Sequence, residues 1–526
     1  MWELLAVLLV AFHWFCIRPH KYWRNKGVHQ GKSLWLLGDA WGFVFRLHSF
    51  AELLQYLYKK FPQRRYYGAY LFNYPILVVK DPDLIKEITI RDFEHFEDHS
   101  AWLPEQSDPL WNQNLFSLKG QKWKDLRNFF RPTFTSSRIK TMYKLMNRCA
   151  ESFVEYFAEK EEDLIEVDLK YTFKRFTCNV IATTVFGVRV DTLRKPDSRF
   201  YQMGLEATNT SGFRSFIYLL HYLFPESVLK FLRIKVYSEN VRTFFSNLVE
   251  DTMRTREEQN IYRPDLIQLI LDAKKGKLIK EDNVIDRGFA VARQEENYGT
   301  SDTHARDITN TEITAQALIF FFGGFDTVSA LMKFTAYELV VNQEIQRKLR
   351  AEINEKYAKC NGAISYEEIL DMNYLDMVIS ECLRKWPSGL AVERVCTKSY
   401  VIQPKLPDER EVTLDVGTLI TIPTFGIHRD PEYYPDPEVF DPERFNEENK
   451  RLIKPYTFFP FGLGPRNCIG SRFAILEAKV LLVHLLRRFE IVPTEKSTIP
   501  IGINRSDFHL DGNGFWFGLK KITKID

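Results

Sequence analysis

The chain is poor in cysteine, and its cysteines are not clustered. It has seven among 526 residues, and no two of them form a CxxC pair. This scatter excludes a disulfide framework and a zinc site built on cysteine pairs, so we expect reduced thiols on the cytosolic side.

The chain also lacks an excess of charge of either sign. Its 72 basic residues nearly balance its 69 acidic ones, giving a net charge of +3, which offers no case for a nucleic-acid partner. No internal repeat or low-complexity tract occurs. A 45% apolar fraction is ample for a core, and 27% charged residues argue against disorder. By length the chain forms two or three domains or one large unit.

Long apolar runs are scarce as well, and one lies at the N-terminus. Residues Leu4–Ile17 are nearly all apolar, and five basic residues or histidines follow by position 26. A spanning helix needs about 20 residues. A cleaved signal peptide is the alternative, but its positive charges would precede the apolar run. We expect a membrane anchor at 1–20, a linker at 21–48 and a cytosolic catalytic body at 49–526.

The most informative stretch is Phe458–Gly470, with the sequence FFPFGLGPRNCIG. Its glycines and Pro465 exclude regular structure, and the apolar helical pattern Phe473–Phe489 follows. Cys468 therefore lies at a helix N-terminus, which favours a thiolate. A lone thiolate is a poor zinc site but a good axial ligand for haem iron. The alternative is a buried structural cysteine.

This stretch resembles the haem-binding loop of the cytochromes P-450, which reads F-x-x-G-x-R-x-C-x-G. The matching residues are Phe461, Gly464, Arg466, Cys468 and Gly470. The resemblance implies that Cys468 ligates the iron of haem b and that Arg466 meets a propionate. The segments FSLKGQKW and PRNCIGSRFA most resemble the insect microsomal branch of this family, which metabolises xenobiotics.

A capping box at Thr309 and Glu312 predicts a long helix that ends near Asn342. Its middle contains adjacent glycines at 323 and 324, each costing about 1 kcal/mol relative to alanine. Such a cost is tolerated where something flat must approach the backbone, although close helix packing is an alternative.

Thr327 shares a face of this helix with Gly323 and Gly324, and its hydroxyl is spaced to bond the carbonyl of Gly323. The segment GGFDT resembles the family's A/G-G-x-D/E-T motif. That resemblance implies catalytic roles for Gly324, Asp326 and Thr327, with the last two governing proton delivery to dioxygen.

Trp123 and Arg127 are four residues apart and therefore share a helix face. Taken alone, the pair is better explained by an amphipathic surface helix with a core tryptophan. The pair resembles the family's W-x-x-x-R helix, which implies that both side chains hold a propionate. Arg394, seven residues after Pro387, matches the family's strand arginine that meets a propionate. The neighbouring face is basic, which is either solvated surface or a docking site for an acidic flavoprotein, and carries Lys119, Lys122, Lys124 and Arg131.

Glu381 and Arg384 have i,i+3 helical spacing, and Arg444 belongs to a downstream P-E-R-F segment. Any helix may carry such a pair. These residues resemble the family's E-x-x-R helix and its partner, which implies a buried structural network of one carboxylate and two guanidinium groups behind the haem.

Three further segments are predicted to shape the surroundings of the site. Phe93–Phe116 is a long loop, which is usually functional, and the resemblance implies that it covers the substrate cavity. Phe213–Leu232 is either core or a second membrane contact. A hairpin is expected in Asn504–Phe517, with Phe508 and Leu510 reaching the cavity.

The resemblance implies a mainly α fold with a small β portion, preceded by one anchor helix in the endoplasmic reticulum membrane. It implies monooxygenation of a lipophilic small molecule, such as a plant toxin or insecticide. Electrons would come from NADPH through the membrane flavoprotein NADPH-cytochrome P-450 reductase, with cytochrome b5 as a further partner. Oxidation of a hormone or fatty acid, a reductase-independent isomerase or dehydratase, and a haem sensor are the alternatives.

Overall fold

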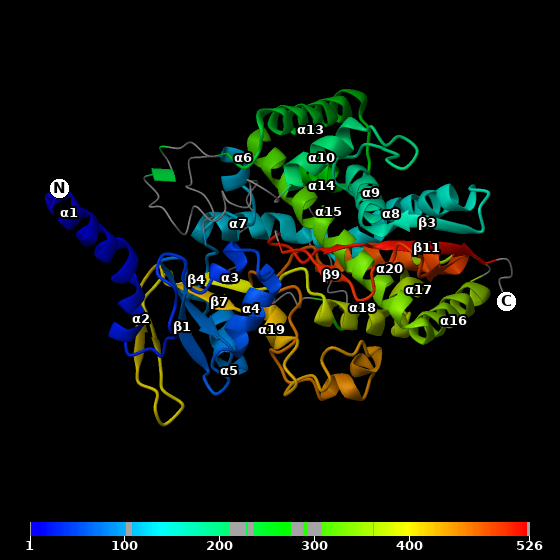
Figure 1. Cartoon of the computed structure of the whole chain (residues 1–526). Helices are drawn as coiled ribbons and strands as arrows, with labels where there is room; N and C mark the ends of the chain where they lie inside the picture. The colour runs from blue at the N-terminus through cyan, green and yellow to red at the C-terminus, as the bar shows by residue number, and fades with distance from the viewer. Residues whose placement is uncertain are drawn as a thin grey trace.

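The structure is a computed structural model that describes residues 2–100, 108–209, 228, 229, 231, 235–274, 288–291, 308–360, 362–505 and 507–522. These residues are mainly helical with a small β portion, as predicted, and Figure 1 shows the long helix α15 running through the middle of the molecule. The segment predicted at 213–232 lies mostly outside the described residues.

The α-helices follow the apolar periodicity of the sequence. Those of the N-terminal half are α1 (Trp2–Phe12), α2 (Tyr22–Asn25), α3 (Trp41–Val44), α4 (Phe50–Lys59), α5 (Pro82–Lys86), α6 (Pro109–Asn112), α7 (Gly120–Phe130), α8 (Ser136–Ala158), α9 (Leu169–Thr184), α10 (Arg199–Thr208) and α13 (Glu239–Gln259). The remaining ones are α14 (Leu266–Lys274), α15 (Asn310–Val341), α16 (Gln343–Lys359), α17 (Tyr366–Leu370), α18 (Asn373–Lys385), α19 (Thr424–Ile427) and α20 (Ser471–Arg488).

The strands form small sheets at two sides of this helical body (Figure 1). One sheet has the order β1-β2-β7-β4 and comprises β1 (Tyr66–Leu71), β2 (Tyr74–Val79), β7 (Leu419–Ile422) and β4 (Val392–Val395). Another has the order β3-β11-β8 and comprises β3 (Leu164–Asp168), β11 (Trp516–Lys521) and β8 (Phe489–Val492). Two-stranded ribbons pair β5 (Tyr400–Ile402) with β6 (Val412–Leu414) and β9 (Gly502–Ile503) with β10 (Gly512–Asn513).

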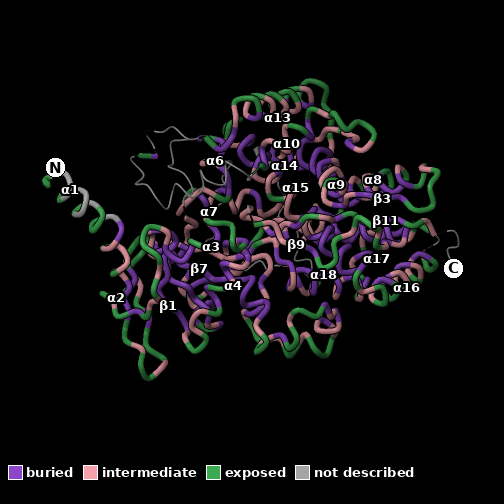
Figure 2. Tube along the Cα trace, in the orientation of Figure 1, coloured by how far each residue is buried: buried purple, intermediate pink, exposed green. Residues whose placement is uncertain are grey.

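Helix α15 begins at the predicted capping box. The Thr309 hydroxyl accepts from the Glu312 backbone N–H, and the Glu312 carboxylate accepts from the Thr309 N–H. Among the described residues, α15 is the one helix long and apolar enough to cross a membrane, but most of its apolar window is buried within the protein. The tube in Figure 2 passes through buried residues at this centre, so α15 is a core helix on which the site is built.

The N-terminal segment projects from the body (Figure 1), where α1 continues into a π-helical turn, His13–Ile17. The expected anchor is not established by these elements, because α1 has 11 residues against the about 20 that a span requires. The predicted linker packs on the body: Trp23 is fully buried, and its indole N–H donates to the Ala69 carbonyl of β1.

Candidate active site

The loop 458–470 is a tight turn that presents Cys468 at the start of α20. The Cys468 backbone N–H donates to the Phe461 carbonyl at 2.8 Å, and Gly470 is the N-cap of the helix. Gly464 has φ +67°, and a Cβ there would lie 1.8 Å from the Thr89 carbonyl oxygen. Gly464 is therefore required both by its backbone conformation and by the close approach of Thr89.

Cys468 borders an interior cavity of about 590 Å³, which gives its side chain accessible surface although it lies deep inside the protein. Burial raises the pKa of the Cys468 thiol, while the Gly470 N–H and the charge of Arg127 oppose that shift. The helix N-terminus thus favours the thiolate, as expected, but the desolvation of Cys468 outweighs this effect. A bound metal cation deprotonates a coordinating thiol by its own charge.

The other predicted cofactor residues converge on the same cavity. The Arg466 guanidinium lies 3.9 Å from the centre of the Trp123 ring and donates to the Glu97 carbonyl at 2.7 Å. Arg127 donates to the Asn467 side-chain carbonyl at 2.7 Å. Arg394, on β4, donates to the Leu463 carbonyl at 3.1 Å. All these side chains, together with Phe461, line the cavity.

Three buried guanidinium groups thus face one cavity with little anionic compensation. Burial and mutual repulsion lower the pKa of Arg394 to about 10 and that of Arg466 to about 9. Burial likewise lowers the pKa of Arg127 to about 10. Among the described residues, Asp98 ion-pairs with Arg466 at 3.3 Å, whereas Arg127 and Arg394 have no carboxylate partner.

These arginines fit a dianionic group inside the cavity. The Arg394 Nε and Arg466 Nη1 atoms are buried and have no hydrogen-bond partner. Buried charges and donors without partners are costly, and two carboxylates would satisfy them. A flat macrocycle with two propionates therefore fits this donor set, with Cys468 available to its metal ion.

Helix α15 borders the cavity with the predicted glycine and threonine positions. A Cβ at Gly323 would meet no atom within 4 Å, so this backbone faces open space. At Gly324 it would lie 3.1 Å from Ile181 of α9, so this glycine also serves close helix packing. The Thr327 hydroxyl donates to the Gly323 carbonyl, and Asp326 ion-pairs with Lys174 at 2.5 Å.

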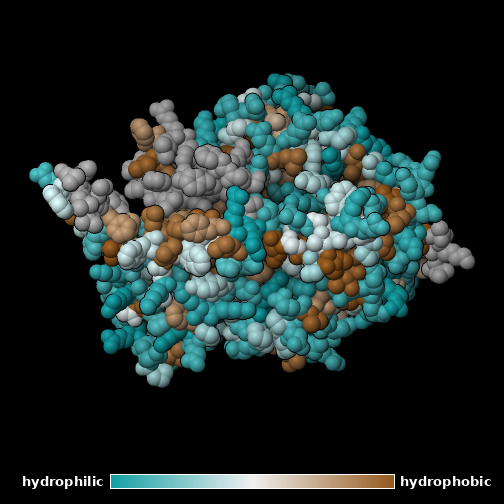
Figure 3. Space-filling view, in the orientation of Figure 1, coloured by the Kyte–Doolittle hydropathy of each residue, from teal (hydrophilic) through white to brown (hydrophobic). Residues whose placement is uncertain are grey.

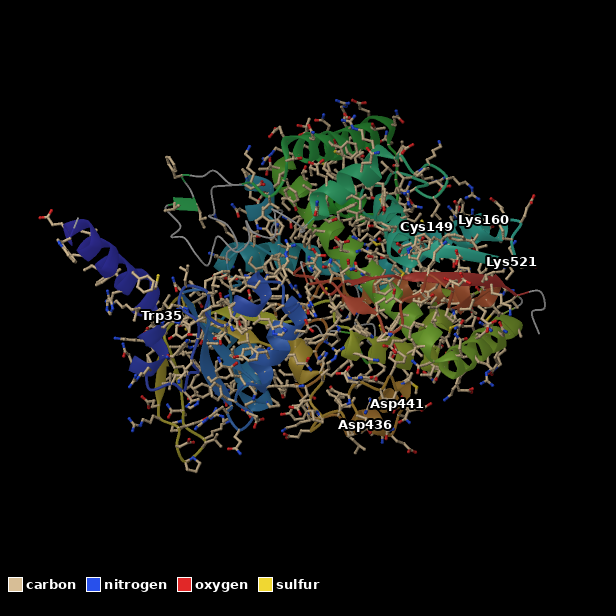
Figure 4. All side chains as sticks on the ribbon, in the orientation of Figure 1. Trp35, Cys149, Lys160, Asp436, Asp441 and Lys521 are labelled. Atoms are coloured by element: carbon tan, nitrogen blue, oxygen red, sulfur yellow. The ribbon has the colours of Figure 1, made fainter. Side chains whose placement is uncertain are left out.

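The predicted structural network lies behind the cavity. Arg384 donates to both oxygens of Glu381, at 2.7 and 2.8 Å, and both side chains are fully buried. The Arg444 Nε atom lies 3.5 Å from the same carboxylate. The loop below α18 completes the network, since the Asp441 N–H donates to Glu381 at 3.0 Å (Figure 4).

Sequence reasoning missed three residues at this site. His99 lines the cavity and stacks on Phe116 with ring centres 4.9 Å apart. Lys174 is the partner of Asp326, and His509 lines the cavity from the β9–β10 connection. The predicted neighbour of His509, Phe508, does line the cavity, whereas Leu510 packs into the core.

A second recess of about 860 Å³ opens beside residues 20–35 and is lined largely by polar side chains. It contains none of the predicted cofactor or α15 residues. The interior cavity, which contains Cys468, is therefore the candidate active site.

The fold and this cysteine-centred cavity define a helical protein built to enclose a flat anionic cofactor. The family model described as Cytochrome P450 matches residues 29–511, so the chain belongs to the cytochrome P450 family, which comprises haem-thiolate monooxygenases.

Curated relatives match over nearly the whole chain. Cytochrome P450 9e2 of Blattella germanica is 41% identical, covering 96% of this chain and 94% of that protein. Cytochrome P450 6k1 of the same species is 35% identical, covering 95% and 93%. Cytochrome P450 9b2 of Drosophila melanogaster is 33% identical, covering 98% of both chains. This chain is thus similar to insect members of the family.

Proposed function

We propose that this protein is an NADPH-dependent monooxygenase of lipophilic xenobiotics such as plant toxins or insecticides. The observation that supports this proposal most directly is the cavity, where Cys468 and Thr327 border one largely apolar interior space. Phenylalanine side chains from three separate segments, represented by Phe50, Phe322 and Phe508, suit flat apolar molecules.

The cofactor-binding residues are assigned from their chemistry. Cys468 ligates the iron, and Arg127, Arg394 and Arg466 hold the propionates with Trp123. The haem, when bound, supplies the activation of dioxygen and the one-electron chemistry. The apolar lining of the cavity excludes water from the space between Cys468 and α15.

Proton supply is assigned to α15. The Thr327 hydroxyl donates to the Gly323 carbonyl and lines the cavity, so its oxygen can still accept a hydrogen bond from a donor there. Asp326, the residue before Thr327, is only partly buried and forms an ion pair with Lys174 at 2.5 Å. Asp326 therefore connects outer solvent with the neighbourhood of Thr327, while Gly324 lets α9 pack closely against this turn.

Electrons come from NADPH through a separate flavoprotein reductase, with cytochrome b5 as a second donor. The docking face is the basic surface of α7, which carries Lys122 and Lys124 in the same helix as Arg127. Lys124 is already paired with Glu97 at 2.5 Å, so Lys122, which is exposed, is the better candidate contact.

Attachment to the endoplasmic reticulum membrane is proposed through the N-terminal region. Figure 3 shows apolar side chains gathered where this region joins the body, and Figure 4 labels Trp35 there. The exposed apolar residues of this patch are Leu34, Trp35, Leu36, Trp41, Phe45 and Leu47. Such a contiguous patch marks a membrane or protein contact.

The test is reconstitution with haem and the reductase. We expect the reduced carbon-monoxide complex to show the absorption of thiolate ligation, and product to depend on NADPH. Product formation without NADPH would contradict the proposal and favour an isomerase or dehydratase.

Thr327→Ala should retain the carbon-monoxide spectrum and NADPH consumption but form less product and more hydrogen peroxide. Unchanged product per NADPH would remove Thr327 from the proton path.

A further inference from the structure

The part of the cavity between α15 and the β9–β10 connection is rich in aromatic side chains. We call it the distal chamber and define it by the lining residues Phe43, Phe50, Phe72, Phe322, Phe508 and His509. Phe508 is fixed against the N-terminal segment, because its ring centre lies 5.1 Å from that of Phe43 and 5.2 Å from that of Phe50. The His509 ring lies 6.2 Å from Phe322, directly before Gly323 on α15.

His509 is the unsatisfied polar side chain of this chamber among the described residues. The nearby hydroxyls are used inside the protein: Thr327 donates to Gly323, and Ser388 donates to the Thr327 carbonyl at 3.2 Å. His509 makes no hydrogen bond with any part of the protein that the structure describes, although it borders the cavity. An imidazole in such a position needs a partner, and a ligand in the cavity can provide it.

The connection that carries His509 is held firmly. Asp511 ion-pairs with the buried Lys333 of α15 and with Lys170 of α9. The Asn504 N–H donates to the Asp511 carbonyl at 2.8 Å across the hairpin. The ion pairs of Asp511 with α15 and α9 therefore fix the backbone that carries His509. A residue that determines specificity needs such a fixed position.

The surroundings of His509 keep its ring neutral. Burial lowers the pKa of His509, although the carboxylates of Asp326, Asp507 and Asp511 oppose this shift and Lys174 adds to it. Asp326 is paired with Lys174, and Asp511 with Lys170 and Lys333, so none of these lysines is left to neutralise an anion in the chamber. A neutral imidazole offers one donor and one acceptor. A carboxylate placed here would be buried without a counter-charge, which is costly.

We propose that His509 determines substrate specificity by hydrogen-bonding one neutral polar group, such as a carbonyl or hydroxyl, of an otherwise apolar aromatic substrate. Anionic lipids such as fatty acids are disfavoured in this chamber. This inference deepens the proposed function and rests on it, because it names the chemical class that the monooxygenase selects.

The experiment uses the full-length haem-loaded protein and three ligands of one size. These are 2-isopropylnaphthalene, 2-acetylnaphthalene and 2-naphthoic acid, whose substituents have the same number of non-hydrogen atoms, and binding is measured by the change in haem absorbance. We expect the ketone to bind about 3- to 10-fold more tightly than the hydrocarbon, the size of one net hydrogen bond. The acid should bind more weakly than both.

His509→Phe should reduce the preference for the ketone to less than about twofold while the hydrocarbon still binds. His509→Gln retains a donor and an acceptor and should keep part of the preference. The matched control is His484→Gln on α20, where His484 bonds Asn147 at 2.8 Å away from the cavity lining. This control should leave all three affinities unchanged.

A ketone-to-hydrocarbon ratio that is the same in the wild type and in His509→Phe would overturn the assignment. So would tightest binding of the acid, or no absorbance change with any of the three ligands. Failure of the proposed function has a different signature, namely no NADPH-dependent product from ligands that do bind. A changed ratio without altered carbon-monoxide spectra excludes a merely structural effect of the substitution.

Discussion

Replacing Arg384 with alanine tests the buried network most directly. The Arg384 guanidinium makes two hydrogen bonds to Glu381, and it also donates to the His428 carbonyl at 2.9 Å and the Pro437 carbonyl at 2.8 Å. Both side chains of the pair are fully buried. Arg384→Ala therefore leaves a carboxylate and two carbonyl groups without their main donor in a buried region.

The expected loss follows from that geometry. Breaking a buried ion pair by removing one partner costs about 3–5 kcal/mol. The orphaned carbonyls add to this loss, since an unsatisfied buried acceptor costs about 1–3 kcal/mol. Arg444, 3.5 Å from Glu381, compensates in part. We expect a destabilisation of at least about 3 kcal/mol, a large fraction of the about 5–15 kcal/mol that stabilises a typical domain.

The chain offers a matched control on α13. Arg254 and Asp251 have the same i,i+3 spacing and a contact of 2.6 Å, but their side chains are 67% and 60% exposed. Arg254→Ala should change stability by about 0–1 kcal/mol. Urea unfolding, followed by haem absorbance and circular dichroism, measures both variants. If the two variants lose free energy of unfolding by amounts within about 1 kcal/mol of each other, then burial does not make the Arg384 pair more stabilising than the exposed pair.

Three further outcomes are expected. Cys468→His should abolish NADPH-dependent product even where haem is retained, because neutral imidazole lacks the electron donation of a thiolate; hydroxylated product from this variant would contradict the ligand assignment. Deleting residues 1–20 should move much of the protein to the soluble fraction on centrifugation with its haem content unchanged; full membrane retention would refute the anchor. Burial lowers the pKa of His428 to about 3, so the unfolded chain binds the extra proton below about pH 6.5 and stability falls by up to about 1.4 kcal/mol per pH unit. His428→Gln should flatten this fall in urea unfolding between pH 6.5 and 5, and an unchanged slope would mean that another group titrates there.

Local patterns predicted the elements that local interactions determine. The capping box located the start of α15, and the glycines with Pro465 located the loop before α20. Local pattern is less reliable around Pro75, because a proline argues against the interior of a strand, whereas β2 begins at Tyr74 and contains it. Pro75 is tolerated there, since β7 pairs with β2 only from Ile76 onward and leaves Pro75 with a neighbouring strand on one side.

The missed residues depend on contacts between distant parts of the chain. Lys174 and Asp326 are 152 positions apart, and no periodicity or motif in either segment indicates their pairing. The same holds for His99, whose ring nitrogen lies 3.2 Å from the Glu393 carbonyl. The cofactor motif was informative because its chemistry lies within 13 consecutive residues, whereas these contacts require the assembled fold.

The buried arginines of this protein fall into two groups, those with carboxylate partners and those without, which sequence motifs alone do not distinguish. Arg384 has its carboxylate and carbonyl partners within the chain, so its charge is compensated as soon as the protein folds. Arg127 and Arg394 are also buried, but no described carboxylate pairs with them, and the Nε of Arg394 lacks a partner. Stability alone would not favour such an arrangement, because uncompensated buried charge destabilises the folded state. The missing compensation fits an anionic ligand in the cavity, and this deficit is the physical difference between Arg127 and Arg394 on the one hand and the structural Arg384 on the other.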